Sequence, residues 1–335
     1  MKNKEIQALR AFFCLIIIIF HFTSRYKSIF NTDIGIFNNF IFDILGTFGV
    51  LSFFLISGIF LIPLKYNTKK DKLLCILKRF LSIWLTYICA IVVIYILSLT
   101  SFIPDSRKVN FIGFLQNVFF INYFTKCGYV DGSHWYITAL VIMYAWTSIF
   151  IIFNLDKNIF FMIGFSIFSF IMFLFSSIYN IKICNYIFNI LNDKYMNMIF
   201  IGIGIRFFKE EKKSFASIIL IIVNYIILGF ISPEYFYLVP ISFFICYFAY
   251  NNKIKFLEKI KSFVGLGDMT FSIYLIHQNI GYGFLLLFSN FMNYYYSLIL
   301  TVVIIYIIGV LFYFLIEKNI KLFISFLFNR GRIIK

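Results

Sequence analysis

Long apolar runs alternate with short polar breaks along the whole of this chain. An apolar run of about 17–25 residues is long enough to cross a bilayer as a helix. The pattern therefore predicts ten membrane-spanning helices and an all-α, polytopic membrane helical bundle. We place the spans at residues 7–24, 40–63, 80–102, 134–153, 159–179, 195–208, 215–231, 235–250, 269–290 and 297–320. The apolar stretch 110–124 is interrupted by Gly113, Gln116 and Asn117, so we interpret it as an interfacial helix.

Composition supports a membrane protein. Of the residues, 62% are hydrophobic and 13% are charged, which excludes an ordinary soluble domain. The apolar runs leave no room for an appended soluble domain, so residues 1–335 are expected to form a single membrane domain. The six cysteines are scattered along the chain, and their spacing predicts neither a zinc cluster nor a disulfide framework.

The net charge of +16 is distributed unevenly between the two sides of the predicted bundle. With ten spans and a cytoplasmic N-terminus, 23 of the 30 Lys and Arg residues fall on the inner side. This bias follows the positive-inside rule and predicts that both termini are cytoplasmic. The charge therefore indicates an inner membrane face that attracts anionic lipids and polyanionic ligands, and not a nucleic-acid-binding surface.

Arg10 and His21 lie on the first apolar run, with ten residues between them. Eleven helical steps turn about 1100° and rise about 16 Å, so both side chains are predicted on one helix face. An ionisable group inside a membrane is costly and usually marks a site or a pathway. Arg10 is either an anchor at the inner membrane surface or a clamp for phosphate. His21 is either a general base or acid, or a neutral histidine bonded to a neighbouring helix.

Two later spans also carry residues that suit either packing or binding. Ser57 and Gly58 lie in the second span, where small residues favour close helix packing. His134 and Trp135 open the fourth span from outside. They are either interface residues or the lining of an outward-facing site for a polar substrate, because an aromatic ring can stack on a sugar.

The ninth span contains three consecutive polar residues, His277, Gln278 and Asn279. One buried polar residue is common, whereas three in a row indicate a cavity or a water path. Arg79 and Glu317 lie at the inner ends of the third and tenth spans. Each is either a surface anchor or, with the arginine of the first span, part of a cytoplasmic entrance.

These motifs, in this order, resemble the acyltransferase-3 family of integral membrane acyltransferases. The resemblance covers nearly the whole chain and rests on Arg79 and on the segments 9–21, 48–61, 133–144, 270–280 and 314–319. It implies transfer of an acyl group, most often acetyl from acetyl-CoA, to a hydroxyl of a cell-envelope polysaccharide or glycolipid. The implied partners are acyl-CoA, an extracytoplasmic glycan and the lipid bilayer of a bacterial cytoplasmic membrane. No metal is implied.

The family pattern also suggests roles for individual residues. His21 matches the catalytic histidine, and Arg10 and Arg79 match arginines that we expect to bind acyl-CoA. The candidates for substrate binding are Ser57, His134, Trp135, His277 and Asn279. Leu51 stands where an acidic residue or proline is common in the family, which leaves the acceptor subgroup open.

Acyl-coenzyme A is an extended molecule with phosphates at one end and a thioester at the other. Its shape suits a phosphate clamp, Arg10, and a base, His21, about 16 Å apart on one helix face. His21 is then expected to deprotonate the acceptor hydroxyl as it attacks the thioester, with a transient acyl-histidine as a second route. Two other classes stay open: a transporter or flippase of a lipid-linked sugar, and a non-catalytic sensor or assembly subunit. A transporter would move its substrate without consuming acyl-CoA.

Overall fold

The computed structural model describes residues 3–30, 39–125, 127–191, 193–211 and 214–333. This part of the chain is built of helices and contains no strand. Seven of its helices are long and apolar enough to cross a membrane. They are Lys4–Phe30, Phe40–Leu61, Lys69–Ser98, Gly132–Ile152, Ile159–Tyr179, Thr270–Ser289 and Tyr294–Phe328. The predicted all-helical membrane class is confirmed, whereas the count of ten spans and the orientation of the termini stay predictions.

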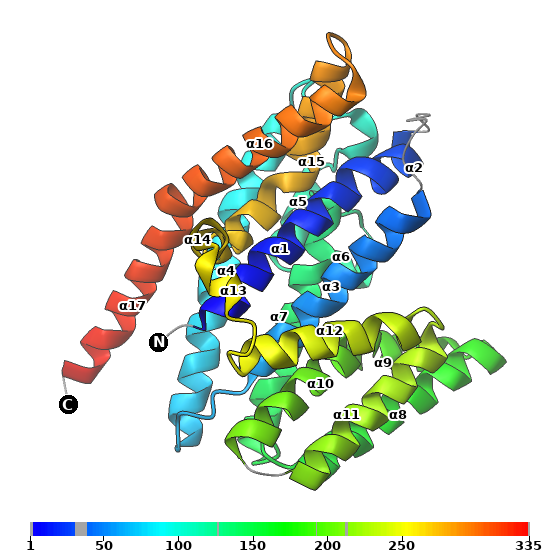
Figure 1. Ribbon diagram of the computed structural model, residues 1–335, viewed down its shortest axis with the longest axis vertical. Coiled ribbons are helices and arrows are strands. Elements are labelled where there is room, and N and C mark those ends of the chain that lie inside the picture. The colour runs from blue at the N-terminus through cyan, green and yellow to red at the C-terminus, as the bar shows by residue number, and fades with distance from the viewer. Residues whose placement is uncertain (1–2, 31–38, 126, 192, 212–213, 334–335) are drawn as a thin grey trace.

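The helix that carries Arg10 and ends just before His21 belongs to a group of four helices that run side by side (Figure 1). The group consists of α1 (Lys4–Phe20), α3 (Asn39–Leu61), α15 (Thr270–Ser289) and α16 (Tyr294–Phe312). α1 packs against both α3 and α15, and α15 packs against α16. The rings of Phe13 on α1 and Phe48 on α3 meet edge to face, with centroids 5.5 Å apart. Contacts of this kind fix α1 between its neighbours.

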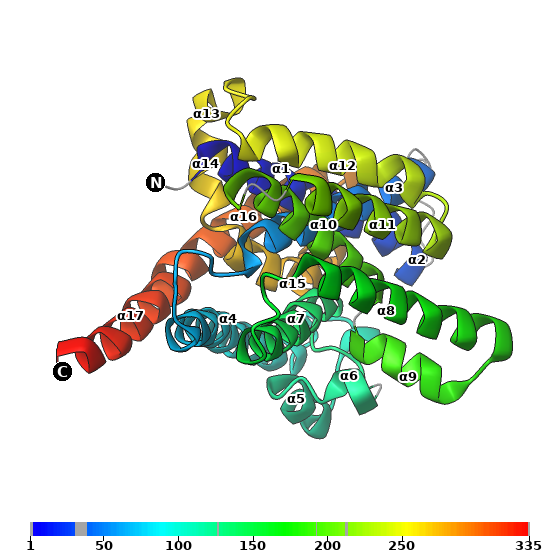
Figure 2. The same cartoon turned by 90° about the horizontal axis from the view of Figure 1, so that it is seen from below.

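A second group of helices covers the C-terminal half of α3 (Figure 2). It consists of α8 (Ile159–Tyr179), α9 (Lys182–Leu191), α10 (Asp193–Glu210), α11 (Ser214–Ile231) and α12 (Tyr235–Tyr250). α10 crosses α3 so closely that a Cβ on Gly58 would lie 2.1 Å from the carbonyl oxygen of Ile199. A Cβ on Gly202 would lie 2.2 Å from the oxygen of Leu55. The small residue predicted to allow close packing in the second span therefore does so, together with a partner on α10.

α4 (Lys69–Ser98) and α7 (Trp135–Ile152) pack on each other, and the long segment between them forms only short helices. These are η2 (Asp105–Arg107), α5 (Phe111–Val118), α6 (Asn122–Thr125) and η3 (Gly132–His134). The stretch predicted as one interfacial helix is thus two short helices. The backbone changes direction between them at Phe120, whose φ is 60°.

The remaining elements connect or extend the bundle. α13 (Phe256–Lys259) and α14 (Lys261–Gly267) lead into α15, and η4 (Tyr313–Glu317) leads from α16 into α17 (Lys318–Ile333). α17 points away from the other helices and carries the C-terminal end (Figures 1 and 2).

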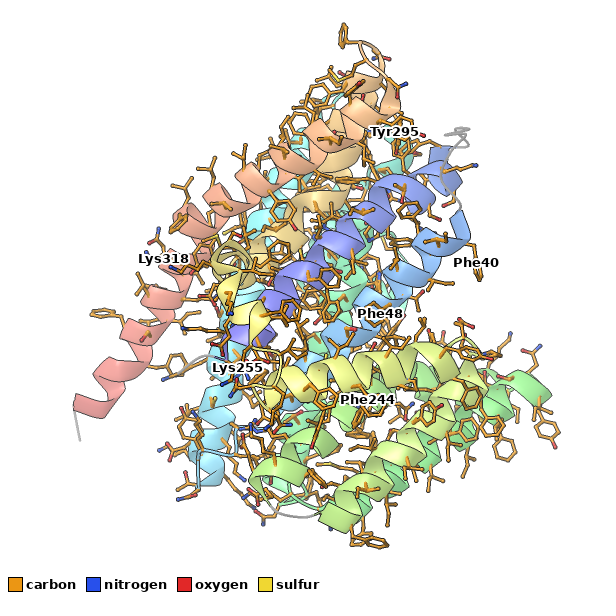
Figure 3. All side chains as sticks on the ribbon, in the orientation of Figure 1. Phe40, Phe48, Phe244, Lys255, Tyr295 and Lys318 are labelled. Atoms are coloured by element: carbon orange, nitrogen blue, oxygen red, sulfur yellow. The ribbon has the colours of Figure 1, made fainter. Side chains whose placement is uncertain are left out.

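Large apolar side chains cover much of the outside of the bundle (Figure 3). Phe40 on α3 and Phe244 on α12 are 68% and 54% exposed. In the most apolar 18 residues of α8, only 22% are buried inside the protein. A soluble protein rarely exposes so much contiguous apolar surface, whereas lipid is a suitable solvent for it.

Candidate active site

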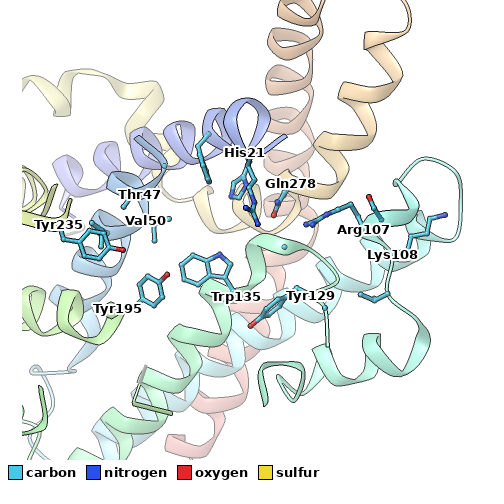
Figure 4. Close-up of a pocket in the computed structure, with 18 residues that line it drawn as sticks. His21, Thr47, Val50, Arg107, Lys108, Tyr129, Trp135, Tyr195, Tyr235 and Gln278 are labelled. Atoms are coloured by element: carbon cyan, nitrogen blue, oxygen red, sulfur yellow. The ribbon is translucent and has the colours of Figure 1, made fainter. Parts of the chain in front are cut away.

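His21 lies at a local change in helix geometry. α1 ends at Phe20, and the chain continues as the π-helix η1 (His21–Arg25) before α2 (Tyr26–Phe30). Single π-turns inside α-helices are rare and are frequent at functional sites. The side chain of His21 is 8% exposed and borders a cavity of about 560 Å³, which we call the His21 cavity (Figure 4). Its lining includes Arg25, Thr47, Val50, Arg107, Tyr129, Trp135, Tyr195 and Gln278.

Arg10 borders a different and larger cavity of about 900 Å³, which we call the Arg10 cavity. Its lining includes the cationic residues Arg10, Lys65, Arg79, Arg206, Lys209 and Lys321 and the acidic residues Glu210 and Glu317. The guanidinium of Arg10 donates a long hydrogen bond of 3.4 Å to Oε1 of Gln7. Six cations against two acids give this cavity a positive potential that favours a polyanionic ligand.

A packed wall separates the two cavities. Val50 of α3 borders both of them, and Ile17, which shares a helix face with Arg10 and His21, borders the Arg10 cavity. A Cβ on Gly49 would lie 2.9 Å from Cγ1 of Ile17, so α3 presses directly on this residue. The face from Arg10 to His21 therefore borders two cavities, and the placement of one extended ligand along it stays a prediction. Side chains occupy the middle of that face.

His277 is buried in this wall beside His21. The ring centroids of the two histidines are 5.0 Å apart. Nδ1 of His277 lies 2.6 Å from the carbonyl oxygen of Tyr274, so Nδ1 carries the proton and Nε2 is left with a lone pair. That Nε2 and Nδ1 of His21 are both buried without a hydrogen-bond partner among the described residues. Two imidazoles with unoccupied nitrogens thus meet between the cavities.

A hydroxyl pair lies on the Arg10 side of the wall. Oγ of Ser57 and the phenolic oxygen of Tyr136 are 3.0 Å apart, and both residues border the Arg10 cavity. The ring of Tyr136 lies 5.5 Å from that of Tyr274, whose ring in turn lies 5.3 Å from His277. Ring contacts through Tyr136 and Tyr274 therefore lead from the Arg10 cavity to the histidine pair.

The turn that precedes α7 is fixed to the middle of α15 by Asp131 and His134. Oδ2 of Asp131 accepts a hydrogen bond of 2.8 Å from the backbone nitrogen of Asn279. Nε2 of His134 donates to the carbonyl oxygen of Leu275 at 2.8 Å. In a regular α-helix these two backbone groups, four residues apart, bond to each other. The side chains of the turn thus provide hydrogen-bond partners for the backbone N–H of Asn279 and the carbonyl oxygen of Leu275, beside the position where His277 faces His21.

Asp131 is fully buried and its carboxylate is well supplied with donors. Oδ1 accepts bonds of 2.9 Å and 2.7 Å from the backbone nitrogen and the hydroxyl of Ser133. Burial opposes ionisation of Asp131, but the nearby rings of His134 and His277 and the bonds from Ser133 and Asn279 outweigh it and lower its pKa. The carboxylate is therefore charged and holds the turn in place.

The structure distributes the predicted site residues over three places. His21 and Trp135 border the His21 cavity, and Arg10, Arg79 and Ser57 border the Arg10 cavity. His134, His277 and Asn279 border neither cavity and are each at most 1% exposed. Their contacts hold the wall and the turn beside it.

A comparison with protein-family models bears on this arrangement. The model of the acyltransferase-3 family, described as an acyltransferase domain, matches residues 3–318. This chain belongs to the acyltransferase-3 family. Membership implies acyltransferase activity, and the acyltransferase is a multi-pass membrane protein. No curated protein and no solved structure matches the chain.

Arg206 lies at the acyltransferase site but was not singled out from the sequence. Arg206 is 7% exposed on α10, and its Nη1 donates to the carbonyl oxygens of Ile59 and Ile62 at 3.2 Å and 2.7 Å. Arg79 donates from α4 to the oxygens of Phe60 and Leu61 at 2.6 Å and 3.0 Å. Both arginines therefore cap the C-terminal end of α3, where the last carbonyls of a helix lack partners. An arginine within an apolar run was the available signal for Arg206.

Glu317 is buried at the end of the π-helix η4 and borders the Arg10 cavity. Its carboxylate accepts a hydrogen bond of 2.5 Å from the hydroxyl of Ser272 and forms an ion pair with Lys321. The acyltransferase therefore has a π-helix at each cavity. Among the residues that the structure describes, no three His, Cys, Asp or Glu side chains are grouped as metal ligands.

Proposed function

We propose that the protein transfers an acyl group, most simply acetyl, from cytoplasmic acyl-CoA to a hydroxyl of a cell-surface polysaccharide or glycolipid. The observation that carries the proposal is the division of the site into two cavities that share Val50. One is rich in cations, and the other is bordered by His21, whose Nδ1 has no hydrogen-bond partner among the described residues. A donor and an acceptor can thus approach the same wall from opposite sides.

The Arg10 cavity suits the donor. Guanidinium groups offer planar, bidentate hydrogen bonding to phosphate, and Arg10, Arg79 and Arg206 all border this cavity. The orientation predicted from the charge distribution, with a cytoplasmic N-terminus, supports this choice because it would bring the N-terminal end of α1 and this cavity to the cytoplasmic side. A volume of about 900 Å³ is near the upper end of typical small-molecule sites.

The His21 cavity suits the acceptor. We propose that the His21 imidazole takes the proton of the acceptor hydroxyl while the hydroxyl oxygen attacks the thioester carbonyl carbon. The carbon–sulfur bond breaks, the acyl group stays on the acceptor oxygen, and the proton passes from His21 to the leaving thiolate. The ring of Trp135 offers an apolar face for a sugar at the edge of the cavity.

Release of free thiol from acetyl-CoA tests this function. Purified protein in lipid nanodiscs is mixed with acetyl-CoA labelled in the acetyl group and with an envelope glycan extract. We expect thiol release that depends on the extract and an equal amount of label in the glycan fraction. His21→Ala and Arg10→Ala, compared at matched amounts of folded protein, should both lose activity. Full activity in both variants, or movement of glycan without thiol release, refutes the proposal and favours a transporter.

A further inference from the structure

We propose that the acceptor bound in the His21 cavity is a glycan that carries an anionic group, a carboxylate or a phosphate, held by Arg25 and Arg107. This inference rests on the proposed function and specifies the substrate class of the same site. The cationic lining residues of the cavity are Arg25, Arg107 and Lys108, and its described lining contains no Asp or Glu. The charge of this cavity is therefore not balanced from within.

Arg107 is held in place by Asn279 of α15, which also bonds to the turn that precedes α7. Its Nε donates to Oδ1 of Asn279 at 3.3 Å. The amide of Asn279 also donates to the carbonyl oxygen of Val130 at 2.7 Å, and its backbone nitrogen donates to Asp131. Figure 4 shows the guanidinium directed toward His21 and Gln278. With Nε occupied, the two terminal nitrogens remain for a ligand, in the planar fork that matches carboxylate or phosphate oxygens.

Gly132 makes room for this guanidinium. A Cβ at this position would lie 2.3 Å from Nη2 of Arg107 and 3.1 Å from Oε1 of Gln278. That Oε1 is buried and has no hydrogen-bond partner among the described residues, although Gln278 borders the cavity. A buried acceptor without a partner is costly. A ligand hydroxyl would satisfy it beside the guanidinium, as expected for a sugar with a charged substituent.

Arg25 provides the second cation, from η1. Both Arg25 and Arg107 are close enough to the His21 ring to interact with it electrostatically. No Asp or Glu in the described ranges forms an ion pair with either guanidinium. Lys108 differs, because its ammonium lies 2.8 Å from Oδ1 of Asp105 and points away from the cavity in Figure 4. The anion-binding group is therefore the pair of arginines.

A binding experiment without acyl-CoA tests this substrate class. The nanodisc-embedded protein is titrated calorimetrically with trigalacturonic acid and with its trimethyl ester, which keeps every hydroxyl and removes every charge. A second pair, galactose 6-phosphate and galactose, examines phosphate. We expect one acid to bind about tenfold or more tightly than its neutral partner, since charged hydrogen bonds are the strong ones. The preferred pair tells carboxylate from phosphate.

The variants identify the groups responsible. Arg25→Gln and Arg107→Gln should each weaken binding of the preferred acid about tenfold and leave its neutral partner unchanged. Gly132→Ala should resemble Arg107→Gln, because the new methyl group displaces Nη2. Lys182→Gln, which removes an exposed charge at the start of α9, is the matched control and should keep the preference.

Three results overturn the proposal: equal affinity within both pairs, an equal loss for acid and neutral probe in the arginine variants, or no binding of any probe. Acyl transfer does not enter this measurement. Failure of the thiol-release assay would therefore refute the proposed function without changing these affinities.

Discussion

Replacing Asp131 by asparagine examines whether the buried turn supports the site. The two side chains have nearly the same shape, but the carboxylate accepts at both oxygens, whereas the amide has one acceptor and one donor group. Oδ2 accepts from the backbone nitrogen of Asn279, and Oδ1 accepts from the nitrogen and the hydroxyl of Ser133. In either orientation of the new amide its NH₂ group faces a backbone N–H, so at least one buried donor loses its acceptor.

The expected destabilisation of Asp131→Asn follows from that lost acceptor. A buried polar group without a partner costs about 1–3 kcal/mol. Asp131 is 0% exposed, so water does not replace the carboxylate. A change of about 2 kcal/mol lowers the midpoint of thermal unfolding by several degrees in a domain of about 150–250 residues. We expect a shift of that order for Asp131→Asn, measured by intrinsic fluorescence of the detergent-solubilised protein.

The shift should depend on pH with a definite sign. The pKa of Asp131 is lowered in the folded protein, so its ionised form contributes stability that is fully present above its unfolded pKa of about 3.9. This contribution is lost as the pH falls through the lower folded pKa. The difference in unfolding midpoint between wild type and Asp131→Asn should stay constant from about pH 8 to pH 5 and shrink below about pH 4.

Asp105→Asn is the matched control in the same loop. Asp105 is 95% exposed at its side chain and forms an ion pair with Lys108 three residues away, so its replacement should leave the midpoint unchanged. An unchanged midpoint in Asp131→Asn, or a difference from wild type that grows as the pH falls, would refute the reasoning.

Three further perturbations address the packing and the Arg10 cavity. Gly58→Ala should destabilise the protein by about 1–3 kcal/mol in the same unfolding assay, because its Cβ would meet the backbone of α10. In the control, Gly164→Ala on α8, the new Cβ meets nothing within 4 Å, so this variant should be neutral or stabilising. Arg206→Met should lower the unfolding midpoint, because loss of the guanidinium leaves the carbonyls at the end of α3 without their donor at a cost of about 1–3 kcal/mol. A midpoint equal to that of the wild type would contradict this and show that those carbonyls find other partners. Arg10→Gln should raise the KM for acyl-CoA in the thiol-release assay and leave the KM for the acceptor unchanged, and the opposite pattern would contradict the assignment of the donor to the Arg10 cavity.

The sequence predicts the helices well and their contacts poorly. Apolar runs identify helices because a bilayer requires every backbone group to bond within its own segment. The pairing of Gly58 with Gly202 depends on which helix crosses α3, and no periodicity within one segment contains that information. Asp131 was missed for a similar reason. It is an ordinary loop residue until α15, more than a hundred positions later, presents a backbone N–H to it.

The pair Arg10 and His21 illustrates the same limit within a single helix. Regular α-helical geometry from residue 10 to residue 20 supports one face with about 16 Å between the two residues. Ile17 lies on that face as well, and the close approach of α3 at Gly49 turns it into part of a wall. The helix face is thus divided by a side chain that looks like any other apolar residue in the run. In the proposed function donor and acceptor meet at this wall, next to His21 and His277, whose ring centroids lie 5.0 Å apart.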